Sequence, residues 1–231
     1  MKTNFFKGLS GNQLKLIALI AMTLDHAGLQ LFPQYMIFRY IGRLAFPIFA
    51  YMIAEGATYT KNRLRYFLQM FGLGLGCQTV YFFAMGSLYQ CILITFSFSI
   101  LLIFALDHAA RTKQPYAWLL FAVGFAATVF LVEGLPPLLP HTDFRVDYGI
   151  WGILTPVLVF AAPGKFTKLL AMIVPLAMLA AIETNYQWMA FFALALLALY
   201  NGTRGKYKMK NLFYIYYPLH LVVLYVVDLL M

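Results

Sequence analysis

Apolar stretches long enough to cross a lipid bilayer follow one another from residue 14 to the end of the chain. A spanning helix needs about 20 apolar residues to cross a hydrocarbon core of ~30 Å. Only 11% of the 231 residues are charged and 63% are hydrophobic, whereas soluble domains carry about a quarter charged residues. The sequence therefore predicts an all-α polytopic integral membrane protein, with a single helical-bundle domain over residues 1–231.

Hydropathy divides the chain into about nine transmembrane helices. The sixth to eighth are short for a bilayer, which leaves the count open by one or two. The predicted ranges are 14–32, 38–56, 65–85, 91–107, 115–132, 148–163, 167–182, 186–200 and 212–230.

Basic residues gather on one side of this predicted bundle, while the other side receives only Arg145, apart from Arg39 and Arg43 at the mouth of the second helix. Positively charged loops face the cytoplasm, so we expect a multi-pass protein of the bacterial cytoplasmic (inner) membrane with its N-terminus in the cytoplasm. Lysines and arginines against anionic lipid account for the net charge of +9, and no nucleic-acid partner is needed. The residues on the basic side are Lys2, Lys7, Lys15, Lys61, Arg63, Arg65, Arg111, Lys113, Lys165, Lys168, Arg204, Lys206, Lys208 and Lys210.

Ionisable residues interrupt four of the predicted helices at a similar depth, in the outer half of the membrane. Ionisable groups in a membrane are costly and normally face the bundle interior, where they pair or serve function. We therefore expect these side chains to converge on one cavity. The set comprises Asp25, His26, Arg39, Arg43, Asp147, Tyr148 and His220, together with the tyrosines Tyr216 and Tyr217.

Each of these residues also has an ordinary structural explanation. Asp25 and His26 would serve equally as a polar contact between helices, and the arginines as headgroup ligands. Asp147 suits a helix N-cap. His220, next to Pro218, can bond a backbone carbonyl that the proline frees.

Lys15 precedes His26 by eleven positions, about three helical turns, so both side chains face one way with a rise of ~16 Å between them. A cation near the cytoplasm and a base above it suit a long ligand with a phosphate-bearing head and a reactive far end, which is the shape of acetyl-CoA. We expect its nucleotide to dock among the cytoplasmic cations Lys15, Arg63, Arg65 and Lys206. The four histidines lack metal-ligand spacing, so no metal site is predicted.

Four blocks of the sequence resemble the TraX family of membrane proteins. The resemblance implies an acetyltransferase that takes acetyl from cytoplasmic acetyl-CoA and places it on an acceptor across the membrane, such as the N-terminal amine of a conjugative pilin. Lys15 and His26 also fit the R/K-x10-H pattern of acyltransferase-3 proteins, in which the histidine is catalytic and the cation lies near CoA. Heparan-glucosaminide acetyltransferases look more distantly related. The blocks are LKLIALIAMTLDHAG (14–28), FRYIGRLAFPIFAYMIAEGATYTKNR (38–63), DYGIWG (147–152) and FYIYYPLHL (213–221).

The favoured hypothesis is an acetyl-CoA-dependent O- or N-acetyltransferase acting on an extracytoplasmic protein or a cell-envelope glycan. His26 would be the general base, oriented either by Asp25 or, if Asp25 pairs with Arg43, by another acid such as Asp147. Arg43, Tyr148 or Tyr217 would stabilise the thioester oxyanion. The acyl group could pass directly to the acceptor, or through an acyl-histidine or an acyl-cysteine intermediate at Cys77 or Cys91, and the sequence leaves these routes open.

Two other functions compete with this hypothesis. A proton-coupled transporter would use Asp25, His26, Asp147 and His220 as a relay. A non-catalytic assembly component of a conjugation or secretion system would not depend on His26.

Overall fold

The computed structural model describes residues 8–207 and 209–231, which fold into ten α-helices joined by short turns, with isolated bridges in place of strands. Lys2, Lys7, Lys208 and the side chain of Lys210 lie outside this description. Six helices in the described part are long and apolar enough to cross a membrane, and this finding agrees with the predicted class of membrane protein. They are Met36–Tyr59, Arg63–Met85, Ile92–Thr112, Pro115–Gly134, Gly164–Ile182 and Leu212–Leu230.

Helical structure occupies each of the nine predicted ranges in the described part of the chain, but six candidate spans are fewer than nine. Helix α1 (Gly11–Gln30) is not among the six, and the segments Gly149–Ala161 and Gln187–Ala198 are apolar but short. The nine crossings and the cytoplasmic N-terminus therefore stay predictions.

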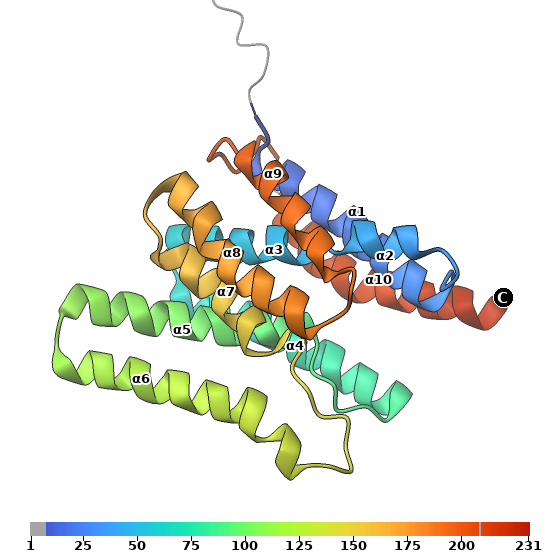
Figure 1. The fold of residues 1–231 in the computed structure, drawn as a ribbon, viewed down its shortest axis with the longest axis horizontal. Coiled ribbons are helices and arrows are strands. Elements are labelled where there is room, and N and C mark those ends of the chain that lie inside the picture. Colours follow the sequence, from blue (N-terminus) through green and yellow to red (C-terminus); the bar gives the residue numbers. More distant parts are fainter. Residues whose placement is uncertain (1–7, 208) are drawn as a thin grey trace, which may run out of the picture. The chain divides into compact units, whose positions relative to one another are not determined.

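The chain divides into two compact units, with helices α3 (Ala45–Tyr59) and α8 (Gly164–Ile182) running from one into the other. Unit 1 contains residues up to Met52 and from Leu176 onward. In it, α1 packs against α2 (Met36–Gly42) and against α10 (Lys210–Leu230), as Figure 1 shows. Helix α9 (Phe192–Ala198) completes this unit.

The N-terminus of α1 is capped by its own capping box and by the segment that follows α9 in unit 1. Ser10 and Gln13 cap each other's backbone amides. The amides of Gly11 and Asn12 donate to the carbonyls of Thr203 and Arg204 at 2.8 and 3.0 Å. The amides that begin a helix lack intrahelical partners, and here these contacts hold the segment after α9 against the start of α1.

The predicted second helix breaks between α2 and α3, at Arg43 and Leu44. Pro47 lies four residues after Arg43, so it cannot donate to the Arg43 carbonyl and its ring crowds that group. The break leaves Arg43 at the C-cap of α2, while α2 and α3 together form the candidate span Met36–Tyr59.

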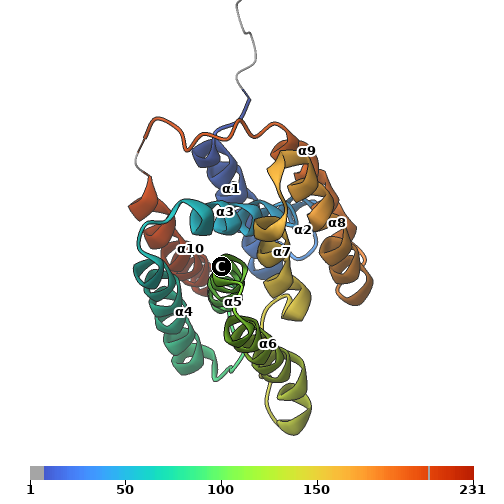
Figure 2. The same ribbon diagram turned by 90° about the vertical axis from the view of Figure 1, so that its left-hand side faces the viewer.

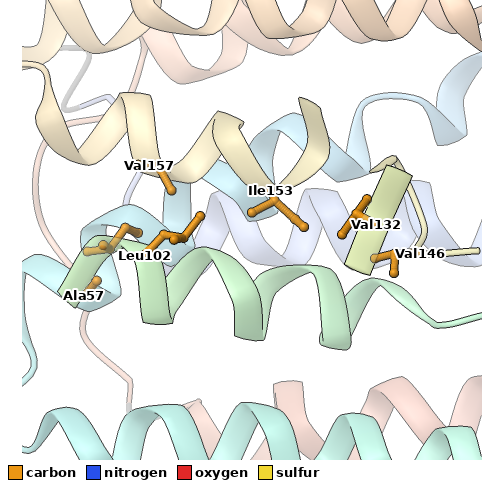
Figure 3. Packing of buried hydrophobic residues seen from close by; sticks show 7 residues of the cluster. Ala57, Leu102, Val132, Val146, Ile153 and Val157 are labelled. Carbon is orange, nitrogen blue, oxygen red and sulfur yellow. The ribbon is translucent and has the colours of Figure 1, made fainter. Parts of the chain in front are cut away.

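Unit 2 runs from Ile53 to Pro175. Its central helix, α5 (Ile92–Thr112), packs against α4 (Arg63–Met85), α6 (Pro115–Val129) and α7 (Gly149–Ala161), which surround it in Figure 2. A buried apolar cluster joins α5 and α7 to the end of α3 and to the segment after α6 (Figure 3). It comprises Ala57, Leu102, Ile103, Val132, Val146, Ile153 and Val157.

The segment 133–147, which follows α6, is tied to its unit by carboxylates. Asp143 accepts hydrogen bonds from the Ser87 hydroxyl and from the Leu88 amide at 2.8 Å, and these bonds hold the pKa of the Asp143 carboxyl below its usual value. Glu133 accepts from the Ile150 amide at 3.0 Å and so caps α7. The segment is thus ordered against the start of α5 and α7.

Candidate active site

Two neighbouring polar groups form in unit 1 where α1 meets α2 and α10. Asp25 and His26 are adjacent on α1, and helical neighbours point about 100° apart. Asp25 faces the arginines of α2, while His26 faces α10. The two side chains therefore belong to different hydrogen-bond networks.

Asp25 is held by both arginines of α2. Arg39 Nη1 lies 2.8 Å from Asp25 Oδ2 and donates to the Asp25 carbonyl at 3.1 Å, and Arg43 Nη2 binds the same carboxylate oxygen. Gly42 permits this approach, because a Cβ atom at its position would overlap the Asp25 side chain. Of the two arrangements that the sequence left open for Asp25, the structure has the pairing with Arg43.

Two further residues complete this cluster and were not anticipated from the sequence. Arg43 Nη1 donates to Gln187 Oε1 at 3.1 Å, and Arg39 Nη2 donates to the Tyr186 hydroxyl at 3.3 Å. The Tyr186 ring lies 5.6 and 5.5 Å from the two guanidinium carbons.

The sequence does contain a pattern that points to Tyr186 and Gln187. They begin the predicted range 186–200 on the outer side, at the depth assigned to Asp25 and Arg43. Polar residues at that depth can be predicted to converge on the same cavity. The cluster Asp25–Arg39–Arg43–Tyr186–Gln187 holds two guanidiniums against one carboxylate.

His26 pairs with His220 rather than with a carboxylate. His26 Nδ1 lies 2.8 Å from His220 Nε2, and the two rings stack with centroids 5.0 Å apart. His220 Nδ1 lies 3.0 Å from the Tyr216 carbonyl oxygen, one turn earlier on α10. The Tyr216 hydroxyl reaches Thr23 on α1 at 2.7 Å, so a second hydrogen bond joins the two helices about one turn before the histidines.

This chain of contacts determines which nitrogen of His26 is basic. A carbonyl oxygen only accepts, so His220 Nδ1 carries a proton, and in a neutral imidazole the other nitrogen, Nε2, then accepts. His26 Nδ1 must therefore donate to His220 Nε2, which leaves the lone pair of neutral His26 on its Nε2. No hydrogen bond of that nitrogen is found within the described residues, and the ring is half-buried. The arrangement presents one basic nitrogen of fixed orientation.

The predicted CoA-binding cations are divided between the two units. In unit 1, Lys15 Nζ lies 5.4 Å from the Phe213 ring, near the segment after α9 that carries Lys206. In unit 2, Arg63 binds Asp107 and lies over the Phe104 ring, while Arg65 is exposed on the first turn of α4.

Asp147 and Tyr148 lie in unit 2, at the start of α7. Asp147 Oδ1 accepts from the Tyr89 hydroxyl at 2.7 Å, and its carbonyl accepts from Thr95 at 2.7 Å. Tyr148 has a φ of 59°, a left-handed conformation that is rare for an aromatic residue. Its N-cap position and Gly152, which leaves room for its Cβ, hold it there. Within the described chain, no three His, Cys, Asp or Glu side chains converge as metal ligands would.

Comparison with known proteins identifies relatives along almost the whole chain. The family described as TraX protein matches residues 10–228. The probable fimbrial assembly protein FimC, serogroup H1, of Dichelobacter nodosus is 24% identical over an aligned length of 245, covering 93% of this chain and 94% of that protein. An uncharacterized protein, RP591, of Rickettsia prowazekii (strain Madrid E) is 55% identical over 38 residues, which are 16% of this chain and 15% of that protein. No solved structure matches.

Proposed function

The chain belongs to the TraX protein family, and from that premise we propose that it is an integral membrane acetyltransferase. It moves an acetyl group from cytoplasmic acetyl-CoA to an amine or hydroxyl of an acceptor on the other side of the membrane. The acceptor is an extracytoplasmic protein, such as a pilin-like N-terminus, or a cell-envelope glycan. The observation that carries the proposal is the set of contacts from His26 Nδ1 to His220 Nε2 and from His220 Nδ1 to the Tyr216 carbonyl. By the donor and acceptor argument above, these contacts leave His26 Nε2 as the base.

In the proposed reaction His26 Nε2 takes the proton from the acceptor amine or hydroxyl while that nucleophile attacks the thioester carbonyl carbon. The new C–N or C–O bond forms, and the carbonyl π electrons move onto oxygen. When this intermediate collapses, the C–S bond breaks and the CoA thiolate takes the proton from His26. Throughout, His26 Nδ1–H stays bonded to His220 Nε2, which orients the ring and accepts a stronger hydrogen bond from the imidazolium than from the neutral ring.

The arginine pair supports the negative charge that develops in this reaction. Arg39 and Arg43 outnumber the one carboxylate they share, so their cluster favours an additional negative charge. Fixed cations aimed at a developing oxyanion are usually the largest single contribution to such catalysis. We assign this role to Arg43, which is a neighbour of Asp25 and so lies close to the helix turn that carries His26. Lys15, about three turns before His26 on α1, is assigned to the CoA phosphates.

A second candidate function follows from the name of the Dichelobacter relative, which is that of an assembly protein. In that case the chain would act in pilus assembly without catalysing a reaction. The two candidates differ in one respect: assembly without catalysis tolerates the loss of the His26 imidazole.

The test is acetyl-CoA turnover by the purified full-length protein in lipid nanodiscs, with water as the acceptor. The wild type should bind acetyl-CoA and slowly release free CoA, which is separated and counted by chromatography. His26→Ala should retain binding and lose release, whereas the matched variant His108→Ala, in α5 of unit 2, should retain both. Absence of binding and of thioester loss in lipid would refute the acetyltransferase. Normal release by His26→Ala would refute the role of that residue.

A further inference from the structure

The amide of Gln187 is an unused hydrogen-bond donor inside the arginine cluster. Gln187 is fully buried. Its Oε1 accepts from Arg43 at 3.1 Å, whereas its Nε2 has no partner among the described residues. The orientation of the amide is fixed, because a guanidinium only donates and must face the oxygen. An unmet donor is therefore intrinsic to this arrangement.

Unmet buried donors are rare, because the lost hydrogen bonds to water are not replaced. The surroundings of Gln187 indicate what would satisfy this one. Arg43 binds the Gln187 oxygen, and both arginines stack on Tyr186, the residue before Gln187, so guanidiniums lie close to this amide. A ligand atom that fits an N–H donor beside two cations is an oxygen that carries, or acquires, negative charge.

We propose that Gln187 contacts the substrate and that its Nε2 donates to the carbonyl oxygen of the acetyl thioester. This inference rests on the proposed function and adds a residue to it. When the nucleophile attacks, the carbonyl π electrons move onto that oxygen, and the hydrogen bond from Gln187 strengthens as the charge grows. Gln187 Oε1 at the same time fixes Arg43, so the two halves of one amide orient the cation and supply the neutral donor.

Two variants separate the two halves of the amide. Gln187→Glu keeps an oxygen for Arg43 and nearly the same shape, but it removes the N–H donor and adds negative charge next to the site. Gln187→Leu removes both the acceptor and the donor. If Nε2 serves the reaction, both variants should lower kcat roughly 10²- to 10³-fold, the range for loss of one oxyanion donor. The KM for acetyl-CoA should rise by no more than the roughly 2- to 10-fold that one hydrogen bond in the ground state contributes. Gln34→Glu, an exposed residue before α2, is the matched control and should keep wild-type kcat.

The ligand supplies a test that requires no mutation. S-ethyl-CoA is a thioether that has a methylene in place of the thioester carbonyl. The wild type should bind acetyl-CoA roughly 2- to 10-fold more tightly than S-ethyl-CoA, the range for one hydrogen bond, and Gln187→Glu should abolish this preference. Calorimetry in nanodiscs gives both dissociation constants, and retained binding of S-ethyl-CoA shows that a variant is folded.

The outcomes distinguish this inference from the proposed function. If the wild type binds neither thioester nor thioether, the acetyltransferase itself is refuted. If it binds both equally, the contact to Gln187 is refuted while CoA binding stands. If Gln187→Glu keeps kcat within about 3-fold of wild type while Gln187→Leu loses activity, Gln187 only holds Arg43. If both variants keep kcat close to that of the wild type, neither half of the amide serves the reaction and the inference is overturned.

Discussion

Replacement of His220 tests whether the histidine pair sets the chemistry of His26. In wild type, the 2.8 Å bond to His220 keeps the proton of neutral His26 on Nδ1 and supports the imidazolium that forms during proton transfer. His220→Leu removes the acceptor, so His26 can place its proton on Nε2 and lose its base. His220→Gln keeps an acceptor, because a glutamine amide oxygen reaches about as far as histidine Nε2.

The magnitude follows from the two states of His26. A hydrogen bond between neutral groups contributes about 0.5–1.5 kcal/mol and one to a charged group about 1.5–3 kcal/mol. The imidazolium of the transition state therefore gains about 1–1.5 kcal/mol from His220 beyond what the neutral ring gains, or roughly 5- to 10-fold in rate. Loss of the neutral bond shifts the tautomer population by a similar factor. His220→Leu should thus lower kcat roughly 30- to 100-fold, less than His26→Ala, for which general-base loss predicts 10²- to 10⁴-fold.

The assay is CoA release in nanodiscs at saturating acetyl-CoA, combined with ¹⁵N solid-state NMR of the histidine nitrogens. We expect His26 to show a protonated Nδ1 in wild type and in His220→Gln, and a protonated Nε2 in His220→Leu. The reasoning fails if His220→Leu keeps the wild-type kcat. It also fails if the variant retains the Nδ1–H tautomer and still loses more than the roughly 10-fold in rate that support of the imidazolium explains, because His220 would then act by some other means.

Three further variants test the packing and the charges of unit 1. Asp25→Asn leaves two mostly buried guanidiniums without their shared carboxylate and should destabilise the protein by about 3–5 kcal/mol, measured as a lower unfolding temperature in detergent; an unchanged temperature would contradict the ion-pair assignment. Gly42→Ala places a Cβ atom into the Asp25 side chain and should reduce folded yield, whereas Gly72→Ala on α4, where a Cβ atom meets nothing within 4 Å, should not; equal yields would show that α1 and α2 separate easily. Lys15→Ala should raise the KM for acetyl-CoA more than it lowers kcat, and a selective fall in kcat would count against its phosphate role.

The positions of the helices could be predicted from the sequence because long apolar runs leave a backbone in lipid no alternative to helix. The break between α2 and α3 was missed, although Pro47 is visible in the sequence. Hydropathy averages over a window and does not register a single absent donor. The number of membrane crossings is harder to predict than the positions of the helices. Helix α1 carries charged and polar residues and is not among the six candidate spans, although it is helical over its predicted range.

Some members of the candidate site could be predicted from the sequence, but Tyr186, Gln187 and the pairings between residues could not. Asp25, His26, Arg43 and His220 come together in unit 1, as depth along the helices suggested. Which of two adjacent residues faces which helix depends on rotation about the helix axis, and the sequence alone left that open. Depth in a membrane likewise gives no lateral position. The hydrogen bonds of Asp147 with Tyr89 and Thr95 lie within unit 2, and the grouping of Asp147 and Tyr148 with the other site residues stays a prediction.

The pairing of Asp25 also bears on the transporter hypothesis. A proton relay through Asp25 requires a carboxylate that exchanges its partners cheaply on every cycle. Here one carboxylate oxygen binds both Arg39 and Arg43, and Arg43 is fixed in turn by Gln187. Protonation of Asp25 would break both ion pairs and leave two guanidiniums facing each other in a mostly buried site, at a cost of several kcal/mol. By contrast, no hydrogen bond of His26 Nε2 is found within the described residues, and His220 Nε2 accepts the hydrogen bond from His26 Nδ1. The charged residues of the cluster are thus fixed, whereas His26 can take up and release one proton. Such a division suits one proton transfer per turnover at a stationary centre and is poorly suited to conduction through a chain of exchangeable groups.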